Sequence, residues 1–261
     1  MFFFENDMDL TMSYSTDFER PRFANYDPFV RQSDSLSISY GNPYLLPEYG
    51  HDFSIEWGIW EGLSLEVAYG RYSNPISNLV FVDTATNIQQ STSKNASLKQ
   101  ELSANISWPT RLGFWSGYHS IWFDYSKTDF TAEFDRAPFF GIGFGVYFYE
   151  HFTLKKDYFI NTTLQINRYS FDANTQSRAN YRWNVGAGKK FLDGDLSVQL
   201  KVNNIIPQKY NSTSVGSNFR STDFYQGQFT QFNVSLSYKF GRLKAISNIQ
   251  DVGGSGQGGR L

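Results

Sequence analysis

The chain has 261 residues, of which 18% are aromatic and 18% are charged, and it contains no cysteine. Its formal net charge of −2 gives no electrostatic footprint for nucleic acid, and the lack of cysteine excludes disulfides and thiolate metal ligands. No run approaches the roughly 18 consecutive apolar residues of a transmembrane helix. Abundant aromatic and small polar residues with few charges are typical of a sheet between lipid and water.

The N-terminal residues show no export signal. Met1–Phe4 leads directly into the acidic stretch Glu5–Asp7, without a basic region, a long apolar segment or a cleavage site. A chain that has membrane-strand patterning but no export signal is expected to be incomplete at its N-terminus.

The first third of the chain predicts antiparallel strands. Apolar and polar residues alternate over 10–18, and this period of two predicts a strand because successive side chains point to opposite faces of a sheet. A long segment without periodicity, rich in Pro, Tyr, Asn and Asp, follows from 19 to 50. The next apolar face consists of Phe53, Ile55, Trp57 and Ile59, and Glu61-Gly62 predicts a tight turn into a returning strand at 63–69.

The middle of the chain continues this pattern. Residues 73–95 are predicted as a loop with a small hairpin of its own, 76–82 against 88–91. A strand over 98–108 is expected to turn at Pro109–Arg111 and return over 113–126, where aromatic residues on both faces leave the register ambiguous. After a loop at 127–138, the stretch 140–148 places large apolar residues on one face and Gly141, Gly143 and Gly145 on the other.

The last third contains the clearest hairpin, from Tyr181 to Asn203, with a tight turn at 192–195. In its second arm, Leu196, Val198, Leu200 and Val202 face one way and polar residues face the other. A turn at 155–157 and a strand over 158–166 precede this hairpin, and a polar loop at 205–227 and a last strand over 232–240 follow it.

Together these elements predict an all-β fold: an antiparallel up-and-down transmembrane β-barrel region with about ten long strands. Connections near 61, 110, 156 and 193 are short and the intervening ones are long, as in barrels with short periplasmic turns and long outer loops. Residues 1–241 are predicted to form the barrel region, and 242–261 a flexible Gly-rich tail. The alternative is a soluble jelly roll or sandwich, whose strands are usually shorter, about 5–6 residues.

Three stretches resemble the C-terminal barrel of TonB-dependent outer-membrane receptors, in the form common in Bacteroidetes. Arg20-Pro21, Tyr26–Phe29 and Gly41–Glu48 are similar to the family's Arg-Pro, Asn-Pro-Phe and Gly-Asn-Pro-x-Leu-x-Pro-Glu series. The hairpin from Gly188 to Asn204 is similar to the family's penultimate hairpin, and Leu236–Gly241 to its closing strand. The resemblance spans nearly the whole chain.

The resemblance implies a location in the bacterial outer membrane and part of a barrel of about 22 strands. It implies import of a bulky nutrient of the siderophore, glycan or vitamin class, powered by the TonB system through a plug domain that this chain lacks. Lipid is then a partner, and a surface lipoprotein is a further candidate. The alternatives are a free-standing small barrel with a structural or adhesive role and a soluble glycan-binding β-sandwich.

No catalytic or metal-binding residues are predicted, and no cofactor. The glycines at 141–145 lie within an alternating strand, and 186–190 lacks the first glycine of a phosphate loop, so neither predicts a nucleotide site. His51, His119 and His151 are far apart in the sequence without an obvious acidic partner, which argues against an enzyme. The segment 41–48 is a candidate for ligand contact, but a structural role is favoured, as a loop that folds back and starts the next strand with prolines that prevent edge pairing. The candidate ligand contacts are aromatic residues of the outer loops: Tyr72, Phe130, Phe171, Tyr210, Phe219, Phe224 and Tyr225.

Overall fold

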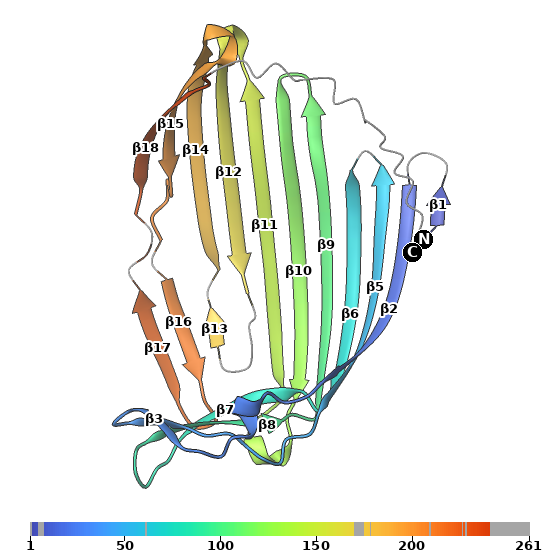
Figure 1. Cartoon of the computed structure of the whole chain (residues 1–261), viewed down its shortest axis with the longest axis vertical. Coiled ribbons are helices and arrows are strands. Elements are labelled where there is room, and N and C mark those ends of the chain that lie inside the picture. The colour runs from blue at the N-terminus through green and yellow to red at the C-terminus, as the bar shows by residue number, and fades with distance from the viewer. Residues whose placement is uncertain are drawn as a thin grey trace, which may run out of the picture.

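The computed structural model describes residues 2–4, 8–60, 62–169, 175–177, 179–208, 210–225, 227 and 229–240. Its main feature is a curved antiparallel sheet of 11 strands in the order β1-β2-β5-β6-β9-β10-β11-β12-β14-β15-β18 (Figure 1). Strands that follow one another in this sheet are also neighbours in it, which is an up-and-down topology. The predicted all-β, up-and-down fold is confirmed.

The strands of this sheet, called the wall from here on, are much longer than ordinary sandwich strands. Apart from the three-residue β1, they have between 8 and 15 residues. Their bounds are β1 Phe2–Phe4, β2 Met8–Glu19, β5 Glu48–Trp60, β6 Leu63–Ser73, β9 Leu98–Leu112, β10 Trp115–Asp129, β11 Phe139–Thr153, β12 Tyr158–Arg168, β14 Asn180–Phe191, β15 Leu196–Asn203 and β18 Gln231–Tyr238.

The strand register sorts the wall into one apolar and one polar face. Across β2 and β5, Tyr14 pairs with Phe53, while their neighbours Ser13 and Ser54 pair on the other face and share a 2.6 Å hydroxyl–hydroxyl hydrogen bond. The apolar side chains stay largely exposed, and Leu236 for example is 71% exposed. A continuous exposed apolar face of this extent is what a lipid-facing wall requires.

The polar face changes its charge along the sheet. On the strands from β5 to β10 it carries mainly carboxylates, including Asp52, Glu66, Glu101 and Asp124. On β14 and β15 it carries Arg182, Lys190 and Lys201 instead. The two halves of the wall therefore present opposite charge to the water-filled side.

Glycines on the polar face of β11 make room for a large neighbour. Gly145 pairs with Trp122 of β10, and a side chain at Gly145 would collide with the Trp122 indole. The same indole also lies over Gly143. These glycines thus allow a large aromatic side chain of the neighbouring strand to pack closely against β11.

Two local predictions are wrong. The turn between β9 and β10 falls at 113–114, where Gly113 has φ +47°, and Pro109–Arg111 lies inside β9. Pro109 is tolerated there because β6 pairs with β9 only as far as Ser107, so that side of the strand has no further partner. In β5, a register shift after Gly58 places Trp60, not Ile59, opposite Leu63.

The other predicted turns lie where the sequence placed them. The chain turns at Leu192–Gly194 between β14 and β15, where Gly194 has φ +91°, and at Lys155–Asp157 between β11 and β12. These short connections lie at one end of the wall, opposite the long ones. Across the parts of the chain that the structure describes, no helix is long and apolar enough to cross a membrane.

The long connections contain secondary structure of their own. One sheet has the order β3-β4-β8-β7, and another has the order β13-β16-β17. The predicted polar loop at 205–227 therefore contains a hairpin, and the segment from 19 to 50 contains two short strands. The elements in the long connections are α1 Phe23–Tyr26, β3 Arg31–Asp34, β4 Ser37–Ser39, β7 Ile76–Val82, β8 Gln89–Asn95, the one-turn 3-10 helix η1 Ala132–Phe134, β13 Thr175–Ser177, β16 Tyr210–Val215 and β17 Arg220–Tyr225.

Candidate functional site

The long connections gather at one end of the wall, where Figure 1 shows β3, β7 and β8 lying across the strand ends. A turn from a distant part of the chain joins them. The Asn218 side chain bonds both backbone groups of Val82, at 2.9 and 2.7 Å, and the Ser217 N–H donates to the Val80 carbonyl at 2.9 Å. The β16–β17 turn therefore extends the edge of β7, and the connections form one layer, called the loop layer from here on.

A small hydrophobic cluster lies within the loop layer. Leu79, Ala96 and Phe134 are almost fully buried, and Phe81 and Phe130 pack against them. Phe134, from η1, is only 1% exposed. Because burial of a large aromatic side chain contributes about 1.5–3 kcal/mol, this cluster fixes β7, β8 and η1 relative to one another.

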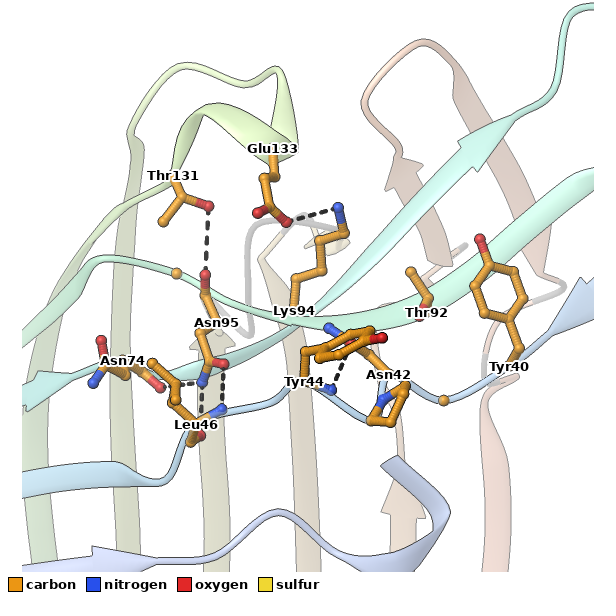
Figure 2. Close-up of a pocket in the computed structure, with 13 residues that line it drawn as sticks. Tyr40, Asn42, Tyr44, Leu46, Asn74, Thr92, Lys94, Asn95, Thr131 and Glu133 are labelled. Carbon is orange, nitrogen blue, oxygen red and sulfur yellow. Dashed lines mark hydrogen bonds and ion pairs between the residues drawn. The ribbon is translucent and has the colours of Figure 1, made fainter. Parts of the chain in front are cut away.

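The segment 41–48 is held against β8 by side-chain amides (Figure 2). Asn95 accepts a hydrogen bond from the Leu46 N–H at 2.8 Å and donates to the Leu46 carbonyl at 2.9 Å. Asn42 donates to the Ser93 carbonyl at 3.2 Å and accepts from the Tyr44 N–H at 3.0 Å. This part of the segment is thus fixed in place by hydrogen bonds.

The contacts of Gly41 show why the segment must begin with a glycine. Its N–H donates to the Asp27 carbonyl at 2.8 Å, and a Cβ at this position would lie 2.6 to 2.7 Å from backbone atoms of Asn25 and Asp27. Only glycine allows the backbone so close to the end of α1. The structural interpretation of the segment, stated from the sequence, agrees with these contacts.

A cavity of about 630 Å³ lies between this segment, β8 and η1, within the 300–1,000 Å³ typical of ligand pockets. Figure 2 shows its lining, which comes from several parts of the chain that are far apart in sequence. The residues that line it are Tyr40, Gly41, Asn42, Pro43, Tyr44, Leu46, Asn74, Thr92, Lys94, Asn95, Ala96, Thr131 and Glu133.

Three polar groups give the cavity its chemistry. The Lys94 ammonium and the Glu133 carboxylate form a 2.9 Å ion pair across it (Figure 2). Thr92 is only 6% exposed, and its hydroxyl has no hydrogen-bond partner among the residues that the structure describes. A buried hydroxyl without a partner is costly, so a hydrogen bond from a ligand that displaces the atoms covering this oxygen would be favourable.

The predicted contact residues do not gather at one place. Tyr72 lies on the polar face of the wall, where its hydroxyl donates to the Asp52 carboxylate at 2.6 Å. Phe130 packs on the buried cluster. Phe219 lines a separate cavity of about 420 Å³ beside β7 and β16, and Phe224 and Tyr225 are 81% and 57% exposed on β17.

Three predictions fall partly or wholly outside what the structure describes. Tyr210 begins β16, where its backbone pairs with that of Tyr225. Phe171 and the predicted tail at 242–261 lie outside the described residues.

Sequence reasoning did not find Thr92, Lys94 and Glu133. None of them belongs to a motif, and their proximity depends on how η1 folds over β8. The signal that could have found the cavity is the Gly-Asn-Pro series, whose Asn42 and Tyr44 line it.

His119 corrects a prediction about the histidines. Its Nε2 lies 2.6 Å from a Glu150 carboxylate oxygen, so it has an acidic partner that the sequence did not reveal. The pair lies on the apolar face near the short turns, and the Trp115 indole N–H donates to the same carboxylate. The imidazole stacks on Trp108 with ring centroids 5.0 Å apart.

Within the described ranges, no group of three or more His, Asp and Glu side chains could hold a metal ion.

These features define the class of protein: an up-and-down β-wall with one apolar, lipid-facing side, one polar side and a folded loop layer at one end. The sequence model of the outer membrane protein β-barrel family matches residues 3–238, so the chain belongs to that family and resides in the bacterial outer membrane. The soluble β-sandwich considered from the sequence is therefore wrong. No curated protein and no solved structure matches the chain.

Proposed function

We propose that the chain supplies the C-terminal wall and outer loops of a TonB-dependent receptor that imports a bulky nutrient. The observation that carries this proposal is the loop layer: its segments dock on one another and form an open cavity of about 630 Å³ at one end of the wall. A preformed cavity of this size is typical of ligand capture, whereas a purely structural barrel has no need of one.

The edges of the wall also support the proposal. Among the described residues, β1 and β18 end the sheet and do not pair with each other. Each unpaired backbone group in lipid costs several kcal/mol, so both edges must find partners, and in this proposal they pair with other strands of a larger barrel. Gly41–Glu48 and the hairpin from Gly188 to Asn204 resemble TonB-dependent receptors, and this resemblance supports a receptor barrel of that kind.

In this proposal the loop layer captures ligand from outside the cell. A plug domain, which TonB pulls on with inner-membrane energy, then opens a path, and the ligand passes along the polar face of the wall. The chain would contribute loops and wall, contact lipid directly, and reach TonB only through the plug. The proposal assigns transport and no catalysis, and a surface lipoprotein remains a candidate partner.

The size of the native protein tests this proposal. Outer-membrane fractions of the source cell are probed by immunoblot with an antibody to the exposed β17 hairpin. A TonB-dependent receptor gives a band far above 30.0 kDa, the mass of this chain. A band at 30.0 kDa would instead establish a free-standing small barrel and refute the transport proposal.

A further inference from the structure

We propose that the cavity between the segment 41–46 and β8 binds a neutral oligosaccharide, with one sugar ring on Tyr44 and one sugar hydroxyl on Thr92. This inference names the substrate class of the proposed receptor and rests on the proposed function. Four properties of the cavity carry it: its charge, the Thr92 hydroxyl, the exposed Tyr44 ring and the occupied edge of β8.

The charge of the cavity favours a neutral ligand. Lys94 and Glu133 are the charged residues in the described lining, and they neutralise each other across 2.9 Å. A carboxylate, phosphate or catecholate ligand would require a cation that is not already paired. The remaining polar lining consists of amide, hydroxyl and phenol groups, which suit a ligand that carries hydroxyls.

The Thr92 hydroxyl supplies a specific recognition point. It is buried at 6% exposure and has no hydrogen-bond partner in the described part of the chain. Thr92 lies between the large cavity and a smaller one of about 130 Å³. A threonine hydroxyl can both donate and accept, so once the atoms that cover it move aside it can pair with a sugar hydroxyl whatever the orientation of that group.

Tyr44 supplies an apolar platform in the lining of the same cavity. Its side chain is 86% exposed although its backbone is fixed, because its N–H donates to Asn42 and Pro43 precedes it. A large exposed aromatic ring on a rigid backbone loses little conformational entropy on binding. The apolar C–H face of a sugar ring can cover it while the sugar hydroxyls point into the polar cavity.

The edge of β8 argues against a peptide ligand. An extended peptide would add as a strand to free carbonyl groups of a sheet edge. On the edge of β8 that faces the cavity, these carbonyls are already occupied: Ser91 accepts from the Tyr40 N–H at 3.1 Å, Ser93 from the Asn42 amide at 3.2 Å and Asn95 from the Thr131 hydroxyl at 3.5 Å. The cavity therefore offers side-chain groups and not a backbone edge.

The test uses the native outer-membrane protein, tagged and purified in detergent from the source cell. It is applied to an array of neutral oligosaccharides that covers glucans, mannans, galactans, xylans and N-acetylated sugars, with acidic oligosaccharides and a random peptide library alongside. We expect at least one neutral oligosaccharide to bind. Tyr44→Ala should weaken that binding about tenfold and Thr92→Val roughly threefold to tenfold, from the loss of one aromatic contact or one hydrogen bond.

Conservative and matched variants separate binding from folding. Tyr44→Phe and Thr92→Ser keep the ring and the hydroxyl, so both should retain near-normal affinity. Phe23→Ala removes another exposed aromatic side chain, 82% exposed, and Thr84→Val removes an exposed threonine hydroxyl in the β7–β8 turn; neither should change affinity. Unchanged thermal unfolding across the set establishes that the losses arise in the cavity.

Several results would overturn the inference: binding to acidic oligosaccharides or peptides alone, no binding on the array, or neutral oligosaccharide binding that Tyr44→Ala and Thr92→Val leave unchanged. None of these results depends on the size of the native protein, so this inference can fail while the proposed receptor stands. Conversely, if the native protein has a mass of 30.0 kDa and binds a neutral oligosaccharide through Tyr44, the transport proposal is refuted and the proposed binding site stands.

Discussion

Two adjacent residues in the middle of the wall test which face meets the lipid. Val67 and Ala68 lie at the centre of β6, Leu63–Ser73. Val67 pairs with Ile55 and Ala104 on the apolar face, and Ala68 pairs with Ser54 and Ser103 on the polar face. An arginine at either position has the same size and charge and differs only in the face that receives it.

Val67→Arg places a guanidinium in hydrocarbon near the middle of the membrane, so it should lower the free energy of unfolding by about 2–4 kcal/mol. Ala68→Arg points into water among the carboxylates of Asp52, Glu66 and Glu101, and should cost less than about 1 kcal/mol. The difference between the two variants is therefore about 1–4 kcal/mol, which is a sizeable fraction of the roughly 5–15 kcal/mol net stability of a domain.

The assay is equilibrium unfolding in urea of the native protein reconstituted in lipid vesicles, followed by tryptophan fluorescence. Val67→Leu serves as the size control, because it keeps the apolar face apolar. The penalty should also depend on depth: Leu236, which pairs with Val198 near the short turn at Leu192–Gly194, should tolerate arginine at a cost of about 0–1 kcal/mol. Equal penalties for Val67→Arg and Ala68→Arg would refute the assignment of the two faces.

Three further predictions concern packing and hydrogen bonding. Gly145→Leu should lower the free energy of unfolding by about 1–3 kcal/mol, because the new side chain meets the indole that covers this glycine; in a Trp122→Ala background, urea unfolding should show most of that loss recovered. His119→Ala should cost about 1–3 kcal/mol by removing a hydrogen bond from the Glu150 carboxylate, whereas unfolding that matches the unmodified protein would show that the pair contributes nothing. Asn95→Ala should leave the unfolding of the wall unchanged but speed proteolytic cleavage within 41–48, because three hydrogen bonds of its side chain are lost; equal cleavage rates would contradict the role assigned to this amide.

The wall could be predicted from the sequence because the residue pattern that forms it lies within each strand. A period of two is visible within each strand, so the apolar and polar faces of 10–18, 53–57 and 196–202 could be assigned without knowing their neighbours. Since each strand of an up-and-down sheet pairs with the next strand of the wall, the short turns also fixed most of the topology. The outer membrane as the location followed from the same alternation together with the resemblance.

Local patterns failed where a neighbour decided the conformation. Taken alone, Pro109 predicts a turn. It lies within β9 instead, because β6 does not pair with β9 beyond Ser107. The bulge at Ile59 depends on how β5 and β6 pair, which alternation in one strand does not reveal. In the same way, His119 and Glu150 are partners only because β10 and β11 pair in one particular register.

The candidate site depended on the tertiary structure almost entirely. Loop aromatic residues were predicted as ligand contacts by residue type, yet Phe130 packs in the buried cluster and Tyr72 bonds to Asp52 on the wall. The cavity forms because segments far apart in sequence converge, as when Lys94 of β8 meets Glu133 of η1. Alternation along a strand records which side of a sheet a residue faces, whereas no local pattern records which loops meet above it, and that is why the sequence determined the wall and only the folded chain determined the site.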